Sequence, residues 1–254
     1  MKRALALIAA AAVSTMSLPI NAAPAKPVAM PMPEFTIYHL EGRRSERIVW
    51  LMEELQMPYK LVFERGSLAG SMAKLKAVNP DMPMAPTVTL GNQVLVESGA
   101  IIEVILDRYA PGKLQPAMDS PEYANYLMWM HYAEGSLASR LFSDYRAWQK
   151  EAPTKRSPLV DSEAVVQFAE KYLTTHAFFG GSEFSGADIM MFWPLNVATS
   201  LNIVDAAQFP KVAAWKEKVQ ERPAYKRMLA KARPDGLVGA LPKLPAHAPA
   251  GERK

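Results

Sequence analysis

Glu97 and Ser98 stand at the end of a short apolar run, and their side chains can bind a small charged ligand. Ser98 lies where a helix N-cap is expected, because apolar residues follow it at helical spacing: Ile101, Ile102, Ile105 and Tyr109. The start of a helix favours a bound carboxylate, since its free N–H groups and its dipole are positive. The Ser98 hydroxyl beside the Glu97 carboxylate adds a donor and an acceptor for an ammonium group. The pair therefore indicates a site for a charged ligand.

The segment from Ala85 to Tyr109 is predicted to position this pair as strand, hairpin, strand and helix. Thr87 to Leu90 and Val94 to Val96 are β-branched or apolar, and Gly91-Asn92 supplies the positive φ angles of a tight turn. Upstream, the pattern predicts a strand, a helix, a strand and a weaker helix, at Phe35 to Leu40, Ser45 to Leu55, Tyr59 to Phe63 and Leu68 to Val78. The order β-α-β implies a right-handed crossover.

Ala85-Pro86, the hairpin and Glu97-Ser98 together resemble the glutathione-binding half of the cytosolic glutathione transferase superfamily. The resemblance implies that Pro86 is cis, that the Ala85 backbone pairs with the cysteinyl part of glutathione, and that Glu97 and Ser98 hold its γ-glutamyl group. A cis bond before proline exposes the preceding backbone, which suits pairing with an extended tripeptide. The alternative is an ordinary hairpin followed by a capped helix.

The segment YHLEGRRSERIVW resembles the same family in two ways. Against the tyrosine classes, Tyr38 matches the catalytic tyrosine and Arg44 the second arginine. Against the yeast and bacterial transferases, Arg44 and Ser45 match, whereas Arg43 replaces the serine usually credited with activation. Further along the segment, Arg47 and Trp50 also match.

A donor aimed at the glutathione sulfur would raise its thiolate fraction at neutral pH. We expect Tyr38 to be this donor, ahead of Arg44 and Ser45. The alternative is that Tyr38 points into the core, that Ser45 only caps a helix, and that the arginines are solvated or paired with Glu46 or Glu53.

Strand signals stop after a Pro/Gly-bearing linker at residues 110–120. Ser120-Pro121 opens a helix that is predicted to reach about Trp148, and its MWMHYAEGS segment resembles the equivalent transferase helix. The resemblance directs Trp129 and Tyr132 towards an apolar second substrate, although core packing explains them equally well.

Further helices are predicted from Ser157-Pro158 to about His176, from Phe209 to Gln220 and from Ala224 to Ala230. In FSGADI, Ser185 and Asp188 form a capping box with a structural role, as in the transferase helical domain. Residues 234–254, rich in Pro, Ala and Gly, are expected to form a flexible tail.

Composition excludes several classes of function. The chain of 254 residues has no cysteine, which excludes chemistry by a protein thiol, and its net charge of +4 comes with no basic cluster that would suggest nucleic-acid binding. Two Met-Pro-Met segments could bind Cu(I), but without nearby His or Cys we expect no metal site. Residues 1–22 read as a secretory signal, with cleavage as late as residue 25, and are too short in their apolar part to span a membrane.

The whole pattern predicts an α/β plus all-α fold. Its parts are a Pro-rich leader at 23–33, a thioredoxin-like domain at 34–110 and a helical domain at 120–233. The resemblance implies an exported, periplasmic homodimer that binds glutathione as co-substrate and conjugates it to a small hydrophobic electrophile. The alternatives are a non-catalytic carrier of glutathione conjugates or hydrophobic ligands, and a glutathione-dependent peroxidase.

Overall fold

The computed structural model describes residues 29–151 and 161–245. The predicted signal at residues 1–22 and the predicted helix start at Ser157-Pro158 lie outside these residues. Within them, no helix is both long enough and apolar enough to cross a membrane.

The N-terminal half is a four-stranded sheet with the order β2-β1-β3-β4. Its strands are β1 (Phe35–Tyr38), β2 (Lys60–Val62), β3 (Thr87–Leu90) and β4 (Gln93–Val96). β1 runs parallel to β2 and antiparallel to β3, which pairs antiparallel with β4. The predicted order of elements is confirmed, although β1 and β2 are each two residues shorter than predicted. The hairpin turn has a positive φ at Gly91 and none at Asn92, the combination typical of a type II′ turn.

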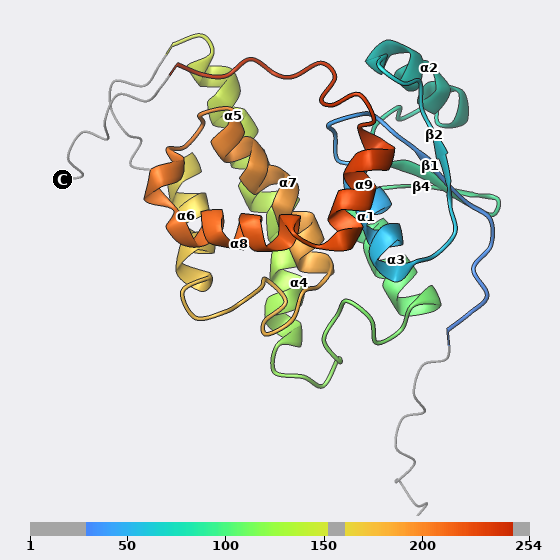
Figure 1. The fold of residues 1–254 in the computed structure, drawn as a ribbon, viewed down its shortest axis with the longest axis horizontal. Coiled ribbons are helices and arrows are strands. Elements are labelled where there is room, and N and C mark those ends of the chain that lie inside the picture. The colour runs from blue at the N-terminus through green and yellow to red at the C-terminus, as the bar shows by residue number, and fades with distance from the viewer. Residues whose placement is uncertain (1–28, 152–160, 246–254) are drawn as a thin grey trace, which may run out of the picture.

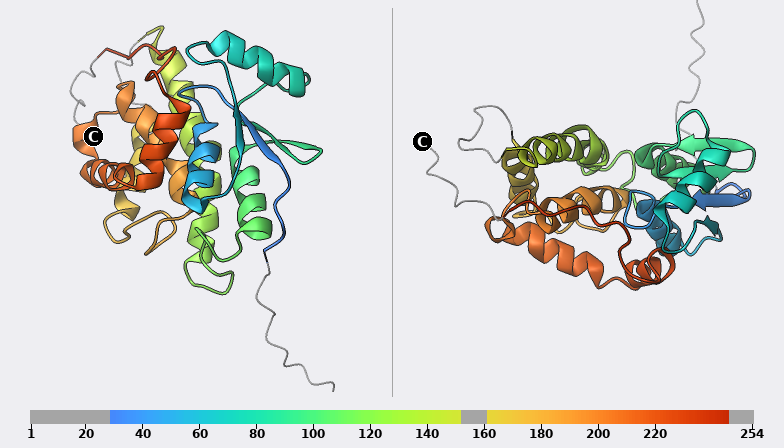
Figure 2. Two further views of the ribbon diagram at one scale, coloured as in Figure 1. Left: turned by 45° about the vertical axis from the view of Figure 1, so that its right-hand side comes forward. Right: turned by 90° about the horizontal axis from the view of Figure 1, so that it is seen from above.

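Two helices, α1 (Glu46–Leu55) and α3 (Ser98–Tyr109), pack on the sheet through one apolar core. Ile37 and Val88 from the sheet and Ile48 and Ile102 from these helices are almost completely buried in this core. α2 (Leu68–Val78) lies on the side of the sheet away from the helical domain (Figures 1 and 2). The sheet and its helices form the thioredoxin-like domain that the sequence predicted.

In the described part of the C-terminal half, the regular elements are all helices. The predicted long helix is α4 (Tyr123–Tyr132), a π-helical segment η1 (Ala133–Ala138) and α5 (Ser139–Trp148). The chain continues through α6 (Ser162–Tyr172), α7 (Gly186–Ser200), the 3-10 turn η2 (Ala206–Gln208), α8 (Pro210–Gln220) and α9 (Pro223–Ala232). Within the described residues, the helix predicted from Ser157-Pro158 begins at Ser162, with Asp161 as its N-cap.

Asp188 and Ser185 form the predicted capping box at the start of α7. The Asp188 carboxylate accepts from the Ser185 N–H at 2.9 Å, and the Ser185 hydroxyl accepts from the Ala187 N–H at 3.2 Å. Asp188 also accepts from the Phe179 N–H and from the Trp215 indole N–H, each at 2.9 Å. This one buried carboxylate therefore joins α7 to α8 and to the turn before α7.

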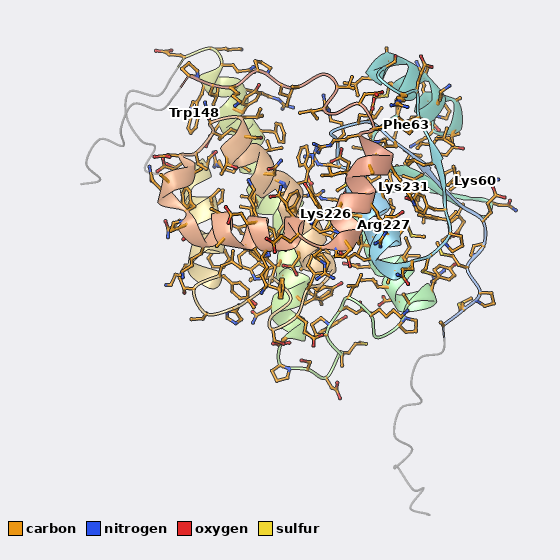
Figure 3. The ribbon with its side chains drawn as sticks, viewed as in Figure 1. Lys60, Phe63, Trp148, Lys226, Arg227 and Lys231 are labelled. Atoms are coloured by element: carbon orange, nitrogen blue, oxygen red, sulfur yellow. The ribbon has the colours of Figure 1, made fainter. Side chains whose placement is uncertain are left out.

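α9 returns to the thioredoxin-like domain and packs along α1. Arg227 donates to the Glu53 carboxylate at 2.8 Å, and Lys231 pairs with the same group (Figure 3). Beside them lies a surface hollow of about 810 Å³, whose apolar lining includes Met57 and Leu61. Glu53 pairs with Arg227 and Lys231, the two cations that line this hollow. The hollow is therefore part of the contact between α1 and α9.

Candidate functional site

The strand register brings the predicted site residues to one edge of the sheet. Tyr38, the last residue of β1, pairs with Thr87 in β3, which in turn pairs with Val96 in β4. The loop after β1, the residues before β3 and the residues after β4 therefore leave the sheet at the same edge. Tyr38, Ala85-Pro86 and Glu97-Ser98 are neighbours for this reason.

The Ala85–Pro86 peptide bond is cis, as expected. Pro86 is buried, whereas Ala85 before it is partly exposed. The next residue, Thr87, holds the bend through its hydroxyl, which donates to the Met84 carbonyl at 2.7 Å. The Ala85 backbone is thus presented at the sheet edge, where an extended peptide could pair with it.

The N-cap of α3 lies one residue earlier than the sequence suggested. Glu97, not Ser98, occupies the N-cap position of α3, with a positive φ of 69°. A non-glycine residue in this region is strained, and such strain concentrates at functional sites. Ser98 is the first helical residue and is buried, with its hydroxyl accepting from Arg47 at 3.1 Å. The sharp turn out of β4 moves the cap back by one residue, which corrects the prediction for Ser98.

Behind Ser98 lies a charge cluster that joins the two domains. Arg47 on α1 is buried and also donates to Glu134 at 2.5 Å and to the Met190 carbonyl at 2.6 Å. Arg44 donates to the same Glu134 oxygen at 2.7 Å. Burial acts to raise the pKa of Glu134, but the two guanidinium groups outweigh it and hold this pKa below its usual range. Glu134 is therefore an anion at neutral pH that fixes both arginines.

Arg47 and Glu134 are the residues that sequence reasoning missed. Arg47 lies in YHLEGRRSERIVW and Glu134 in MWMHYAEGS, the two segments that resemble the transferases. The signal that could have found them is a charged residue among the apolar residues of each segment. Glu134 lies in η1, and π-helical turns occur frequently at functional sites. Their pairing depends on how the two domains pack, which helical spacing does not report.

Tyr38 is partly exposed at the end of β1. Its hydroxyl has no hydrogen-bond partner among residues 29–151 and 161–245, so it can donate to a ligand. Its backbone lies beside that of Thr87, next to the cis bond. Tyr38 stays the predicted donor to a bound sulfur.

Ser45 is fully buried, and its hydroxyl is already engaged with His39 Nδ1 at 2.8 Å. His39 Nε2 lies 2.8 Å from the Ala232 carbonyl, which can only accept, so Nε2 carries the ring proton and Nδ1 accepts from Ser45. Burial lowers the pKa of His39, which favours this neutral form. Since the hydroxyl proton is used within the fold, the prediction of Ser45 as an activating residue is corrected.

We expect Ser45→Ala to reduce stability without changing glutathione affinity. The Leu40 N–H, which donates to the Ser45 hydroxyl at 3.1 Å, and His39 both lose a buried partner, at a cost of about 1–3 kcal/mol. Urea unfolding together with a glutathione titration measures both quantities. A variant of normal stability that no longer binds or activates glutathione would show that Ser45 has the catalytic role.

Trp129 and Tyr132 lie away from the sheet edge. Trp129 is fully buried in the helical domain, where it packs against Phe168 and Phe179. Tyr132 packs on Trp129 and donates its hydroxyl to the Val165 carbonyl at 3.0 Å. Both therefore stabilise the helical core, which corrects their prediction as second-substrate residues.

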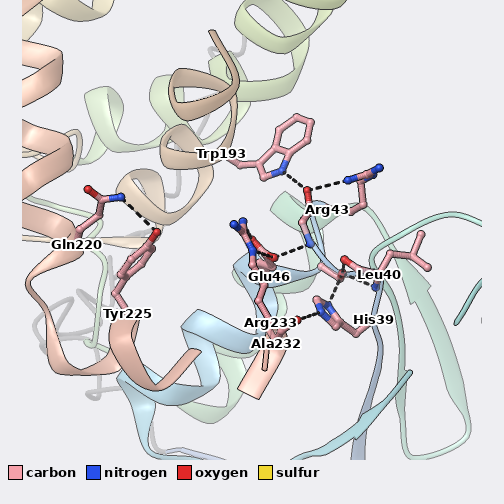
Figure 4. A network of polar contacts seen from close by, with 11 residues as sticks. His39, Leu40, Arg43, Glu46, Trp193, Gln220, Tyr225, Ala232 and Arg233 are labelled. Atoms are coloured by element: carbon pink, nitrogen blue, oxygen red, sulfur yellow. Dashed lines mark hydrogen bonds and ion pairs between the residues drawn. The ribbon is translucent and has the colours of Figure 1, made fainter. Parts of the chain in front are cut away.

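Other aromatic residues of the helical domain lie next to Arg44. The Arg44 guanidinium lies 4.2 Å from the ring centroid of Trp193, and Phe142 stacks on Trp193 at 5.6 Å. The Trp193 indole N–H donates to the Gly42 carbonyl in the loop after β1, at 3.3 Å. Arg43, the next residue of the loop, donates to the same carbonyl at 3.4 Å, and the two side chains approach it from opposite sides (Figure 4). These rings supply the apolar surface between the domains that Trp129 and Tyr132 do not.

No group of three or more His, Cys, Asp or Glu side chains in the described ranges is arranged to hold a metal ion.

Two family models match the chain. Residues 33–107 match "Glutathione S-transferase, N-terminal domain" and residues 123–223 match "Glutathione S-transferase, C-terminal domain". Among curated proteins, the chain is 26% identical over 210 residues to glutathione S-transferase 3 of Schizosaccharomyces pombe, covering 74% of this chain and 84% of that protein. It is 24% identical over 207 residues to the disulfide-bond oxidoreductase YfcG of Escherichia coli, covering 77% and 94%.

Solved structures agree on the fold. A glutathione S-transferase from Actinobacillus pleuropneumoniae superposes with a TM-score of 0.66 at 29% identity, covering 81% of this chain and 94% of that one. A glutathione transferase from Phanerochaete chrysosporium, in complex with oxidized glutathione, superposes with a TM-score of 0.63 at 21% identity, covering 79% and 96%.

Proposed function

The chain belongs to the glutathione S-transferase superfamily, and from this premise we propose that it binds glutathione as a thiolate and conjugates it to an apolar electrophile. The observation that carries the proposal is the convergence of Tyr38, the cis Ala85–Pro86 bond and the Glu97-Ser98 pair at one sheet edge. No single local pattern requires these three features to meet.

In the proposed complex, glutathione lies extended along that edge. Its γ-glutamyl ammonium and carboxylate groups pair with Glu97 and with the Ser98 hydroxyl and N–H at the start of α3. Its cysteinyl amide pairs with the Ala85 backbone, and its sulfur faces the Tyr38 hydroxyl. A hydrogen bond to the thiolate lowers the thiol pKa and so supplies the nucleophile at neutral pH.

The reaction then requires only that the electrophilic carbon is aligned with the bound thiolate. The thiolate attacks the electrophilic carbon, a carbon–sulfur bond forms, and the leaving group departs with the bonding electrons. Binding both reactants at one site makes their reaction effectively unimolecular, which is a large part of the expected rate acceleration. The aromatic surface of Phe142 and Trp193 beside Arg44 suits an apolar electrophile.

Thiol–disulfide exchange is a second candidate, favoured by the similarity to a disulfide-bond oxidoreductase. Since the chain has no cysteine, the attacking thiolate would be that of glutathione. Attack on a disulfide sulfur forms a mixed disulfide and releases the other sulfur as a thiolate. The same bound thiolate serves both reactions, so product analysis with a carbon electrophile and with a disulfide distinguishes them.

Glutathione affinity tests the proposal before any electrophile is known. We expect Ser98→Ala to weaken glutathione binding about tenfold or more, since a hydrogen bond to a charged group contributes roughly 1.5–3 kcal/mol. Calorimetric titration of the parent and the variant with glutathione measures this loss of affinity.

Ser162→Ala is the matched control, because Ser162 is also buried and its hydroxyl is also hydrogen-bonded to a charged side chain, here as the donor to Asp144 at 2.7 Å. Equal affinities of the two variants would contradict the assignment of Ser98, and failure of the parent to bind glutathione would contradict the proposed function.

A further inference from the structure

Arg44 presents a guanidinium group that the fold uses only in part. Its Nε donates to the Glu134 carboxylate at 2.7 Å, and no other acceptor for this group lies in the part of the chain that the structure describes. Its two terminal nitrogens, Nη1 and Nη2, therefore keep their N–H donors for a ligand. The side chain is 32% exposed, so a ligand at the border between the two domains can reach it.

The ion pairs around Arg44 leave one positive charge in excess. Arg44 and Arg47 both donate to a single oxygen of Glu134, so that two cations share one anion. Glu46, a carboxylate at the start of α1, is already paired with Arg233. A partly buried cation without an anion of its own favours a negatively charged ligand, because the ligand replaces the solvation that the cation has lost.

The two arginines face different parts of the proposed site. Arg47 lies on the glutathione side, since it donates to the Ser98 hydroxyl at 3.1 Å. Arg44 lies on the side of the helical domain, where its guanidinium is 4.2 Å from the ring centroid of Trp193 and 5.5 Å from that of Phe142. Arg47 is farther from the Trp193 ring, at 5.7 Å. The free donors of Arg44 therefore lie with the electrophile and not with the γ-glutamyl group.

The contacts of Arg44 suit a ligand that combines a ring with a carboxylate. Contact with an aromatic ring stabilises the cation but uses none of its N–H donors. These donors have a fixed planar geometry, and two of them match the two oxygens of a carboxylate. Phe142 is partly exposed beside them, so the ring of the same ligand can pack on it.

We propose that Arg44 selects electrophiles that carry a carboxylate on an aromatic body, and that its two terminal nitrogens bind this carboxylate. This rests on the proposed function, because it names the substrate class of the same site. In this role Arg44 acts on the electrophile instead of on the glutathione sulfur. Glu134 is then a positioning residue, since it fixes the Arg44 side chain through Nε.

S-substituted glutathiones that differ by one carboxylate test the proposal. S-benzylglutathione and its meta- and para-carboxy derivatives have no thiol to react, so calorimetric titration of the full-length protein gives their affinities without turnover. We expect the parent to bind one of the carboxy derivatives about threefold to fivefold more tightly than S-benzylglutathione, as for an ion pair that is partly exposed to solvent. This preference should weaken at high salt, because salt screens such a pair.

Arg44→Met removes the cation and keeps much of the side-chain volume. It should abolish the preference for the carboxylate, whereas glutathione and S-benzylglutathione bind as in the parent, because Glu134 keeps Arg47. Arg44→Lys keeps the charge without the paired donors, and should retain part of the preference. Arg43→Met is the matched control: Arg43 is also partly exposed in the same loop, but donates to the Gly239 carbonyl at 2.9 Å. Its loss should leave the preference unchanged.

Four results overturn the proposal. They are a parent that prefers neither carboxy derivative, a preference that survives Arg44→Met, and an equal loss of preference in Arg43→Met, which would show a general field instead of a contact. The fourth is an equal loss of affinity for all compounds in Arg44→Met, which would show that Arg44 binds glutathione itself. Failure of the parent to bind glutathione is a different result, and overturns the proposed function together with this inference.

Discussion

Asp188→Ala is expected to leave little folded protein. The carboxylate is fully buried and accepts four hydrogen bonds, from the N–H groups of Phe179 and Ser185, the Ser185 hydroxyl and the Trp215 indole. Alanine leaves all of these donors without a partner in the core. At about 1–3 kcal/mol for each unsatisfied group, the loss exceeds roughly 4 kcal/mol. That is most of the stability of a typical domain, about 5–15 kcal/mol in total.

Asp205→Ala provides the matched control for this prediction. Asp205 also caps a helical turn, but it does so at the surface, where its carboxylate accepts a hydrogen bond from the Ala207 N–H at 3.0 Å. Its loss should cost about 1 kcal/mol. Urea unfolding followed by circular dichroism compares the two variants. Similar midpoints would mean that the buried capping box does not hold the helical domain together.

Arg47→Met is expected to have the second largest effect, and to act on both stability and binding. Methionine keeps much of the side-chain volume but removes the charge that faces Glu134, Ser98 and the Met190 carbonyl. Removing one partner of a buried ion pair costs about 3–5 kcal/mol, and we expect the lower end because Glu134 is partly exposed and keeps Arg44. Ser98 also loses the donor that orients it, so glutathione affinity should fall about tenfold.

Arg140→Met is the control for Arg47→Met. Arg140 pairs with Asp144 one helical turn away, at 3.7 Å and partly exposed, which contributes at most about 0.5 kcal/mol. A double-mutant cycle with Glu134→Gln separates the ion pair from the loss of packing. A small effect of Arg47→Met, similar to that of Arg140→Met, would contradict the central place given to the Arg47–Glu134 contact.

The sequence predicted well those features that depend on local chemistry. The hairpin follows from Gly91 between two β-branched runs, and the capping box from the spacing of Ser185 and Asp188. Glu97 and Ser98 were placed correctly at the end of β4, and only their cap assignment differs by one residue. Such features depend on a few neighbouring residues, so they can be predicted from the sequence before the fold is known.

The other wrong assignments depend on packing between distant segments. Trp129 lies on a helix whose apolar spacing is the same for a core face as for a face lining a cleft, and its neighbour Phe179 is 50 residues away. The Ser45 hydroxyl is engaged by His39, which is itself held by Ala232 of α9. Residues 234–245 have a composition typical of a flexible tail, but Arg43, Arg65 and Tyr145 hold them. Composition cannot report contacts made by other parts of the chain.

The most direct test of the proposed chemistry is the pKa of the glutathione thiol when bound, followed by the ultraviolet absorbance of the thiolate across pH. We expect the bound thiol to titrate at least about one pKa unit below free glutathione, a differential stabilisation of about 1.4 kcal/mol per unit. Tyr38→Phe should remove most of this shift while leaving glutathione bound. A bound thiol that titrates as in free glutathione would contradict thiolate formation at this site, and would favour a carrier of glutathione or its conjugates instead.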